Sequence, residues 1–234
     1  MKKILTSIIL LISIKTFAQQ DINIVLNKAK AKIETVTDYE ATGIMKTNVA
    51  FLKIPIAKVK VYFKNPNKLK VKSESGISFI PKGAVSLNLN NLTGTNKFTV
   101  IDAGTETING VLLRVATLIP QDRNSDVKIS TVYIDEKNSL IKKAETTTKD
   151  NGTYELEMTY STYVAYGLPD KIIFSFNAKD YKLPKGVTFD FDDGVAPPPL
   201  PKNDPLKGKK GRAEITFKNY VINKGVDDAI FTAK

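Results

Sequence analysis

The sequence contains no cysteine, no histidine and no tryptophan among its 234 residues. Without cysteine and histidine, the chain cannot build a thiol nucleophile, a Cys–His dyad, a Ser–His–Asp triad or a zinc finger. The two-histidine, one-carboxylate iron site and disulfide bonds are excluded for the same reason. The remaining reactive residue types form no recognisable constellation. We therefore expect no enzymatic activity, no metal site and no cofactor.

The first 18 residues are typical of a secretory signal peptide. Lys2 and Lys3 precede a short apolar run from Ile4 to Ile14. Thr16-Phe17-Ala18 then supplies the small residues that precede a cleavage site. The apolar run is too short to span a bilayer, and no other stretch reaches 18 apolar residues. We expect cleavage after Ala18 and export of a soluble chain, which cannot be lipidated at a cleavage-site cysteine because it has none.

Positive charge dominates the sequence, with 35 Lys+Arg against 24 Asp+Glu and a net charge of +11. The charge falls to +8 once Lys2, Lys3 and Lys15 are removed with the signal peptide. The lysines are spread over many segments without interleaved stacking aromatics, which argues against nucleic acid as a partner. Anionic envelope polymers or lipid head groups are the more natural counterparts of an exported basic protein.

The hydrophobic pattern predicts one long helix followed by about ten strands. Asp21 can cap a helix over Ile22–Val36, whose apolar residues recur at helical spacing. From Tyr39 onward the period is mostly two, which is typical of strands. Three of the strands read as an antiparallel meander because turn residues separate them. The predicted strand segments after the first are Ala57–Phe63, Leu69–Val71, Leu87–Leu89, Phe98–Val100, Val111–Ile119, Val127–Ile134, Leu140–Thr148, Tyr154–Tyr160, Ile172–Phe176 and Ala213–Val221.

A proline-rich segment at about 178–211 interrupts the strand pattern. It contains six prolines and ends in Lys207, Lys209 and Lys210. Such composition favours an extended polyproline conformation and excludes a central strand. Because a strand pattern resumes beyond it, we interpret residues 19–234 as a single domain that carries this segment as an insertion.

Two groups of acidic residues could be taken for a calcium loop and for a pair of catalytic carboxylates. Asp190, Asp192 and Asp193 lack the ligand count and closing glutamate of a calcium loop. Glu155 and Glu157 lie on one strand face, but alternating charges on a solvent-facing strand look the same. We interpret both groups as solvated surface.

About ten strands with one obvious helix can bury their apolar faces in two ways. The sheet can double or close around a filled core, or it can curl around a short helix and leave a hydrophobic hollow. A hollow would suit acyl chains, which need apolar area rather than placed polar groups. Composition alone leaves both open.

Three motifs in order resemble the LolA/LolB-like lipoprotein-carrier superfamily. The first is Val115-Ala116-Thr117-Leu118-Ile119-Pro120, the second runs from Val127 to Tyr133-Ile134-Asp135, and the third is Leu140-Ile141-Lys142-Lys143-Ala144-Glu145. The helix after the signal peptide, the segment from Tyr62 to Lys70 and the C-terminal Ile215–Phe231 are also similar to that superfamily. Together these features touch most of residues 22–232.

The resemblance implies a mainly β protein with some α, in which a highly curved antiparallel sheet forms an unclosed half-barrel lidded by the N-terminal helix and loops. It also implies a periplasmic carrier or sorting protein, monomeric, that holds acyl chains of lipoproteins or other envelope lipids. An envelope protein-binding or sensor module on the same fold is the alternative. Lys70 is followed by Val71 where the carriers have an aromatic residue, and the proline-rich insertion is not part of a minimal carrier. The absent cysteine excludes the anchored acceptor form.

Strand alternation predicts which side chains would line the lipid-binding cavity. An apolar tip between glycines and a proline, formed by Ile77, Phe79 and Ile80, is predicted to act as a lid, with the alternative that it simply fills the core. The predicted cavity residues are Val59, Val61, Phe63, Leu69, Val71, Phe98, Val100, Leu113, Val115, Leu156, Met158, Phe174 and Phe176.

Overall fold

The computed structural model describes residues 20–48, 56–66, 68–75, 98–149, 152–177 and 210–232. These residues form ten strands, two α-helices and one short 3₁₀ helix. The elements are α1 (Ile22–Glu34), β1 (Asp38–Asn48), β2 (Ala57–Lys64), β3 (Lys68–Ser75), β4 (Phe98–Ile108), β5 (Val111–Pro120), β6 (Val127–Asp135), β7 (Leu140–Thr148), β8 (Thr153–Thr159), η1 (Val164–Tyr166), β9 (Lys171–Asn177), β10 (Lys210–Ile222) and α4 (Ala229–Thr232).

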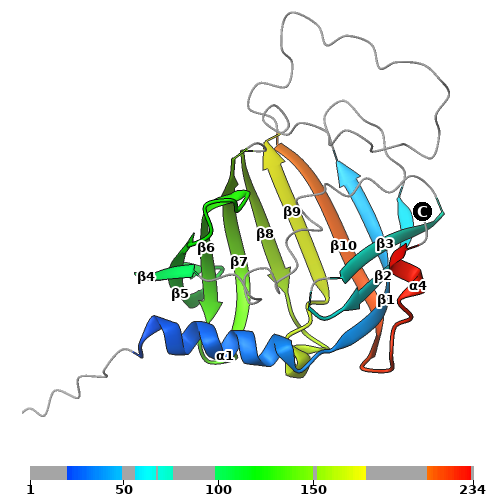
Figure 1. Ribbon diagram of the computed structural model, residues 1–234, viewed down its shortest axis with the longest axis horizontal. Helices are drawn as coiled ribbons and strands as arrows, with labels where there is room; N and C mark the ends of the chain where they lie inside the picture. Colours follow the sequence, from blue (N-terminus) through cyan, green and yellow to red (C-terminus); the bar gives the residue numbers. More distant parts are fainter. Residues whose placement is uncertain are drawn as a thin grey trace, which may run out of the picture.

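All ten strands belong to one antiparallel sheet with the order β3-β2-β1-β10-β9-β8-β7-β6-β5-β4. The last strand, β10, pairs with the first, β1, so the two ends of the domain meet inside the sheet. The sheet curves strongly but does not close, because β3 and β4 remain its two edges (Figure 1). The predicted mainly β class and unclosed half-barrel are confirmed.

Helix α1 forms where the apolar spacing predicts it and lies on one face of the sheet. Asp21 caps the helix by accepting a hydrogen bond from the Asn23 backbone N–H at 2.7 Å. The helix ends at Glu34, two residues before the predicted end. Figure 1 shows α1 crossing one end of the strands in the half of the sheet that contains β5–β8. We call the face that carries α1 the concave face, and the opposite one the outer face.

Period-two alternation sets which side chains face inward. In β2, Val59, Val61 and Phe63 are buried, whereas Lys58 is exposed and Lys60 half-buried. The register pairs Val61 with Ala41 of β1 and Val71 of β3, which continues the same face over the neighbouring strands. Because alternate side chains point to opposite faces, the apolar residues of β2 and β3 line the concave face and their lysines line the outer face.

An aromatic group closes the concave face where β1, β10 and the 160–170 segment meet. The Tyr220 ring centroid lies 4.7 Å from that of Tyr163, 5.0 Å from that of Phe217 and 5.3 Å from that of Tyr39. The Tyr220 hydroxyl donates to the backbone carbonyl of Pro169 at 2.8 Å. This contact ties the segment before β9 to β10.

Several strand boundaries differ from the sequence-based expectation. β4 continues to Ile108 instead of ending at Val100, and β10 begins at Lys210, inside the predicted insertion. The added part of β4 is polar and contains a bulge between Asp102 and Thr105, so it carries little alternation. The predicted signal peptide, the strand Leu87–Leu89 and almost all of the proline-rich insertion lie outside the described residues.

Candidate functional site

The concave face is apolar across the middle of the sheet. Ala213 of β10 lies opposite Phe174 of β9, and Phe174 lies opposite Leu156 of β8. The row continues through Ala144 of β7 and Val132 of β6. All five side chains are buried. Five neighbouring strands therefore contribute one continuous apolar strip.

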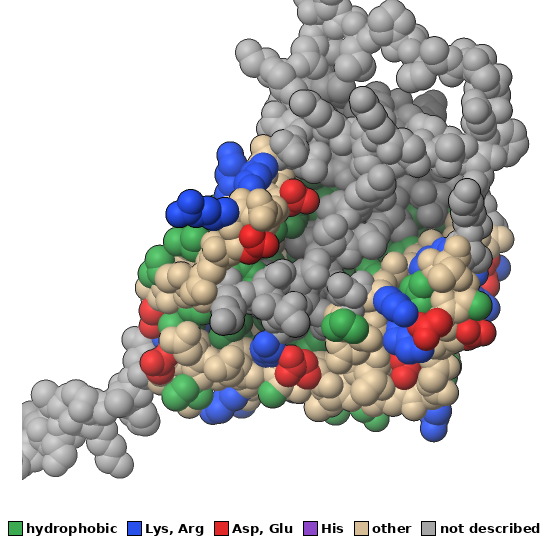
Figure 2. All heavy atoms as spheres, in the orientation of Figure 1, with side chains coloured by type: hydrophobic (Ala, Val, Ile, Leu, Met, Phe, Trp, Pro, Cys, Tyr) green, Lys and Arg blue, Asp and Glu red, His purple; other side chains and the backbone are tan. Residues whose placement is uncertain are grey.

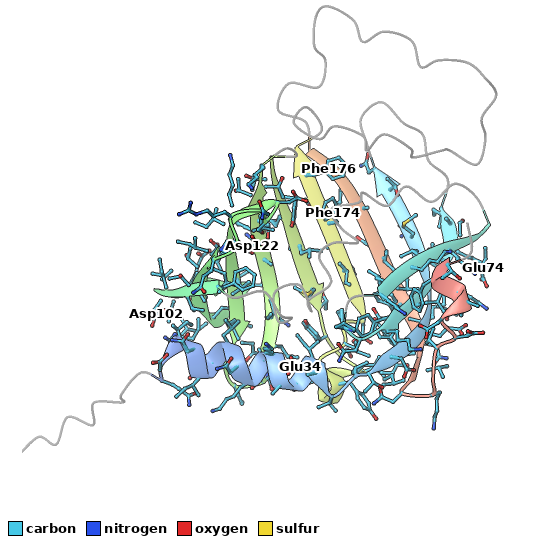
Figure 3. The ribbon with its side chains drawn as sticks, in the orientation of Figure 1. Glu34, Glu74, Asp102, Asp122, Phe174 and Phe176 are labelled. Carbon is cyan, nitrogen blue, oxygen red and sulfur yellow. The ribbon has the colours of Figure 1, made fainter. Side chains whose placement is uncertain are left out.

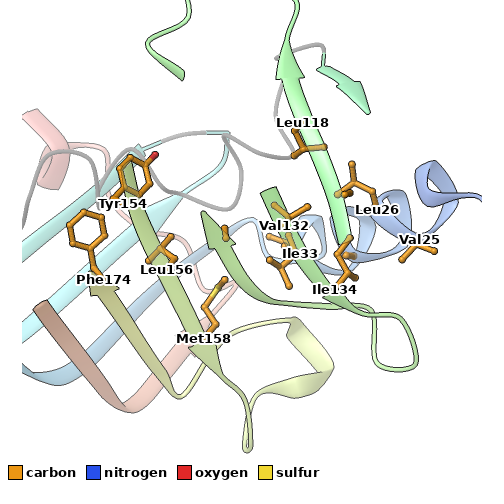
Figure 4. Packing of buried hydrophobic residues seen from close by; sticks show 14 of the residues in the cluster. Val25, Leu26, Ile33, Leu118, Val132, Ile134, Tyr154, Leu156, Met158 and Phe174 are labelled. Atoms are coloured by element: carbon orange, nitrogen blue, oxygen red, sulfur yellow. The ribbon is translucent and has the colours of Figure 1, made fainter. Parts of the chain in front are cut away.

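Helix α1 covers one part of this face. Val25, Leu26 and Ile33 from the helix share one buried cluster with Val132 and Ile134 of β6 (Figure 4). These helix residues occupy one apolar stripe, as the sequence predicts. The helix therefore fills the curve of the sheet at one end, and the rest of the concave face extends beyond it.

Beyond the helix, part of the concave face keeps contact with solvent. Leu69, Val71, Ile172 and Ile215 are only partly buried, although they pack against fully buried neighbours. Ile172 and Ile215 lie directly opposite each other on β9 and β10. Figure 2 shows hydrophobic side chains at several points inside the curve of the sheet. These residues form an apolar surface that an additional ligand could contact.

Three aromatic rings lie side by side on the concave face. The Phe174 ring centroid is 5.5 Å from that of Tyr154 and 5.4 Å from that of Phe176. The Phe176 ring lies over Gly211, where a Cβ atom would collide with it. Glycine at position 211 thus lets the ring approach the backbone. Figure 3 shows Phe174 and Phe176 close together along β9.

A few hydroxyl groups interrupt the apolar surface. Ser130 and Thr146 face each other across β6 and β7, and their hydroxyl oxygens are 2.8 Å apart. Both residues are buried. Among the described residues, Thr47 Oγ1 is the buried side-chain oxygen without a hydrogen-bond partner. A hydroxyl without a partner, such as that of Thr47, can form a hydrogen bond with the polar linkage of an otherwise apolar ligand.

Polar contacts hold both ends of α1. Arg114 is buried, and its guanidinium contacts the Asp102 carboxylate at 2.6 Å. It also donates to the backbone carbonyl of Gln20, just before the helix, at 3.0 Å. At the other end, Lys32 donates to the backbone carbonyl of Asn138 at 2.7 Å. These contacts fix the helix over one end of the concave face.

The outer face of β7 and β8 carries a cluster of closely spaced charged groups. Lys143 contacts Glu145 at 2.7 Å and Glu155 at 3.0 Å. Burial acts to lower the pKa of Lys143, but hydrogen bonds to these two carboxylates outweigh it and raise the pKa above its ordinary value. Burial, together with the neighbouring Glu155 carboxylate, raises the pKa of Glu157. At neutral pH the negative charge of Glu157 therefore destabilises the folded state.

Replacing Glu157 by glutamine is expected to stabilise the protein at neutral pH, because it removes a carboxylate that is repelled by Glu155. The gain should be only about a few tenths of a kcal/mol, because the side chain is exposed and its charge is screened. A carboxyl whose folded pKa is raised loses stability as pH rises from its ordinary value, 4.5, through the folded pKa. The gain should therefore disappear below that ordinary value. Urea unfolding at acidic and neutral pH measures it, and an equal gain at both values would contradict this electrostatic cause.

The structure places most of the predicted cavity residues on the concave face. Two of them, Leu113 and Val115, lie on the outer face in a separate cluster with Tyr133. Both faces of β5 are apolar there, so alternation does not distinguish them. Lipid contact stays a prediction for the whole set. The concave-face residues are Val59, Val61, Phe63, Leu69, Val71, Phe98, Val100, Leu156, Met158, Phe174 and Phe176.

Ile172 and Ile215 are absent from the predicted cavity residues, although strand alternation points to both of them. Ile172 lies two residues before Phe174 on a predicted strand, so period-two alternation places it on the same face. Ile215 lies two residues after Ala213 in the same way. The small residues Ala144 and Ala116 carry no comparable signal, because alanine is common on both faces.

The predicted lid residues Ile77, Phe79 and Ile80 lie outside the described residues. Within the described ranges, no three Asp or Glu side chains gather in a way that could hold a metal ion. Neither α1 nor α4 is long and apolar enough to cross a membrane.

No protein-family model and no curated protein sequence matches the chain. Solved structures do resemble it. A LolA superfamily protein from Nitrosomonas europaea aligns with a TM-score of 0.58 at 13% identity, covering 92% of this chain and 99% of the other. A DUF1329 family protein from Desulfovibrio piger gives a TM-score of 0.56 at 13% identity, covering 91% and 98%.

A third structure is a domain named as an outer membrane lipoprotein-sorting protein, from Vibrio parahaemolyticus. It aligns with a TM-score of 0.56 at 14% identity and covers 89% of this chain and 94% of that domain. All three matches extend over nearly the full length of both chains. The unclosed ten-strand sheet with α1 on its concave face therefore has the fold of the LolA superfamily.

Proposed function

We propose that this protein is a periplasmic lipid-binding carrier or sorting protein that holds acyl chains against the concave face and catalyses no reaction. The observation that carries the proposal is the partly exposed apolar surface around Ile172 and Ile215, which continues the buried strip of the sheet. The predicted signal peptide supports export. The similarity to a lipoprotein-sorting domain supports a lipid as the ligand.

The energetics suit this ligand. Burying one methylene group contributes about 0.8 kcal/mol, so a half-buried chain of about 16 carbons is held by several kcal/mol. Such a ligand needs apolar area and few polar contacts, as the concave face provides. Thr47, whose Oγ1 has no hydrogen-bond partner among the described residues, is a candidate to receive an ester or amide linkage of the lipid.

Native mass spectrometry of protein purified from envelope extract tests the proposal directly. The expected result is a mass above that of the delipidated chain. Organic extraction should remove this additional mass. Equal masses before and after extraction, with no uptake of an acylated peptide, would overturn the carrier function. A protein that co-purifies while no lipid is found would favour the envelope sensor module.

Replacing Ile215 by tryptophan is expected to weaken binding of a fluorescent fatty acid by at least about tenfold, which corresponds to roughly 1.4 kcal/mol. The larger side chain would occupy the partly exposed apolar surface. Thr216→Trp is the matched control, because Thr216 is the next residue on β10, is exposed and faces outward. Equal affinity of the two variants would show that the acyl chain binds elsewhere.

A further inference from the structure

The outer face of β1–β3 carries a dense group of lysines. Their side chains alternate with the apolar residues of the concave face, so they share one surface. Lys60 lies directly opposite Lys72, and Lys64 directly opposite Lys68. Like charges in such cross-strand positions are destabilising. We call this surface the basic face; its residues are Lys46, Lys58, Lys60, Lys64, Lys68, Lys70 and Lys72.

Neighbouring carboxylates neutralise only part of the basic face. Lys60 contacts Glu40 at 3.5 Å and Glu74 at 3.4 Å. Lys64 and Lys68 share the carboxylate of Asp228, at 2.9 Å and 2.7 Å. Glu214 of β10 lies opposite Lys46, but its carboxylate contacts Lys171 and Arg212 instead. Positive charge is therefore left over at Lys46, Lys58 and Lys72.

The excess charge is exposed. Lys46 and Lys58 are exposed and make no ion pair among the described residues. The Lys72 ammonium lies 5.6 Å from the centroid of the Tyr62 ring, which leaves its charge in place. These three lysines are available to an anionic partner.

The other half of the outer face has the opposite sign. Lys143 is surrounded there by Glu145, Glu155 and Glu157, and Glu106 of β4 faces the same side. Figure 3 places Glu74 near one edge of the sheet and Asp102 near the other, on opposite sides of the molecule. The outer face is therefore basic at the β1–β3 end and acidic over β4–β8. A negatively charged surface would attract one end and repel the other, which would orient the molecule.

We propose that the basic face docks the protein on an anionic phospholipid bilayer, with β1–β3 toward the membrane and β4–β8 away from it. This inference rests on the proposed function, because a carrier of acyl chains must meet a membrane to collect or deliver them. Each lysine near an anionic bilayer strengthens binding by about fivefold, and salt screens the attraction. Lysines spread over three neighbouring strands match an array of head groups better than a single small anion.

Co-sedimentation with vesicles tests the docking. Wild-type protein is expected to bind vesicles of phosphatidylcholine mixed with phosphatidylglycerol, to ignore pure phosphatidylcholine, and to be released by salt. The variant Lys46→Gln/Lys58→Gln/Lys72→Gln is expected to bind about ten- to hundredfold more weakly. The same positions changed to arginine should retain binding.

A matched control separates the basic face from net charge. Lys128→Gln/Lys137→Gln/Lys149→Gln removes three exposed lysines around β6 and β7 and leaves the same total charge. An equal loss of vesicle binding in both glutamine variants would overturn the proposal, because net charge alone would then explain it. Binding of soluble polyphosphate through the same three lysines, without vesicle binding, would also overturn it.

The two proposals fail in distinguishable ways. Uptake of the fluorescent fatty acid is measured without vesicles and should be unchanged in the Lys46/Lys58/Lys72 variant. Loss of vesicle binding with normal fatty-acid uptake supports docking by the basic face. Vesicle binding by wild-type protein that takes up no fatty acid would refute the carrier function and leave the membrane contact standing.

Discussion

Replacing Phe174 by alanine is expected to lower the free energy of unfolding of the ligand-free protein by about 3–5 kcal/mol. Phe174 is 2% exposed and lies between the rings of Tyr154 and Phe176. It also lies opposite Ala213 and Leu156 on the two neighbouring strands. Alanine would leave a cavity that these small or fixed neighbours cannot fill, so the loss should fall at the upper end for a core substitution.

Urea unfolding of the delipidated protein measures this loss. Ser175→Ala is the matched control, because Ser175 is the next residue on β9 and faces outward; it should change stability by no more than about 0.5 kcal/mol. Similar losses for the two variants would contradict the placement of Phe174 in the core.

The Phe174→Ala variant also tests whether a bound acyl chain contacts the aromatic row. A bound ligand stabilises the folded state in proportion to its affinity and concentration. If an acyl chain contacts the aromatic row, the enlarged space should change the stabilisation that a fatty acid gives to Phe174→Ala relative to wild type. An identical ligand-induced shift in both proteins would place the acyl chain away from Phe174.

The concave face was predictable wherever one face of a strand is charged. In β2 and β3, lysines alternate with Val59, Val61 and Val71, so only one register buries the apolar residues. In β8, the glutamates do the same for Leu156 and Met158. The predicted faces of these strands agree with the structure.

Alternation gives no such guidance in β5. Leu112 and Leu113 are both apolar, yet Leu112 is 65% exposed and Leu113 is 2% exposed. Arg114, the next residue, is charged yet buried, because its guanidinium contacts the Asp102 carboxylate and the backbone carbonyl of Gln20 at the start of α1. Pairing across the sheet and packing of the helix decide this strand, and neither can be read from the strand's own residues.

The strand order also depends on contacts between distant residues. β1 pairs with β10 through partners such as Ala41 and Tyr220, which are far apart in the sequence. Local pattern predicts that both segments are strands, but not that they are neighbours. The resemblance to a known superfamily supplied the half-barrel, which composition and periodicity left open against a filled sandwich.

The junction around Tyr220 gives the second large expected effect. Tyr220→Ala should lower the free energy of unfolding by about 3–5 kcal/mol, because three aromatic rings lose a common neighbour. Tyr220→Phe keeps the ring and removes only the hydroxyl, which leaves the Pro169 carbonyl without that donor. This loss should be about 1–3 kcal/mol.

Comparing the two Tyr220 variants separates ring packing from the hydrogen bond. Val221→Ala is the control, because Val221 is the next residue on β10 and is 45% exposed; it should cost no more than about 0.5 kcal/mol. Thermal and urea unfolding measure all three variants.

If Tyr220→Phe loses as much stability as Tyr220→Ala, the hydrogen bond to Pro169 holds this junction and the rings contribute little. If Tyr220→Ala loses no more than Val221→Ala, the aromatic group does not anchor β10 to the segment before β9. The expected order, alanine well above phenylalanine and phenylalanine above the control, follows because burial of the ring removes far more apolar surface from water than one hydroxyl contributes through its hydrogen bond.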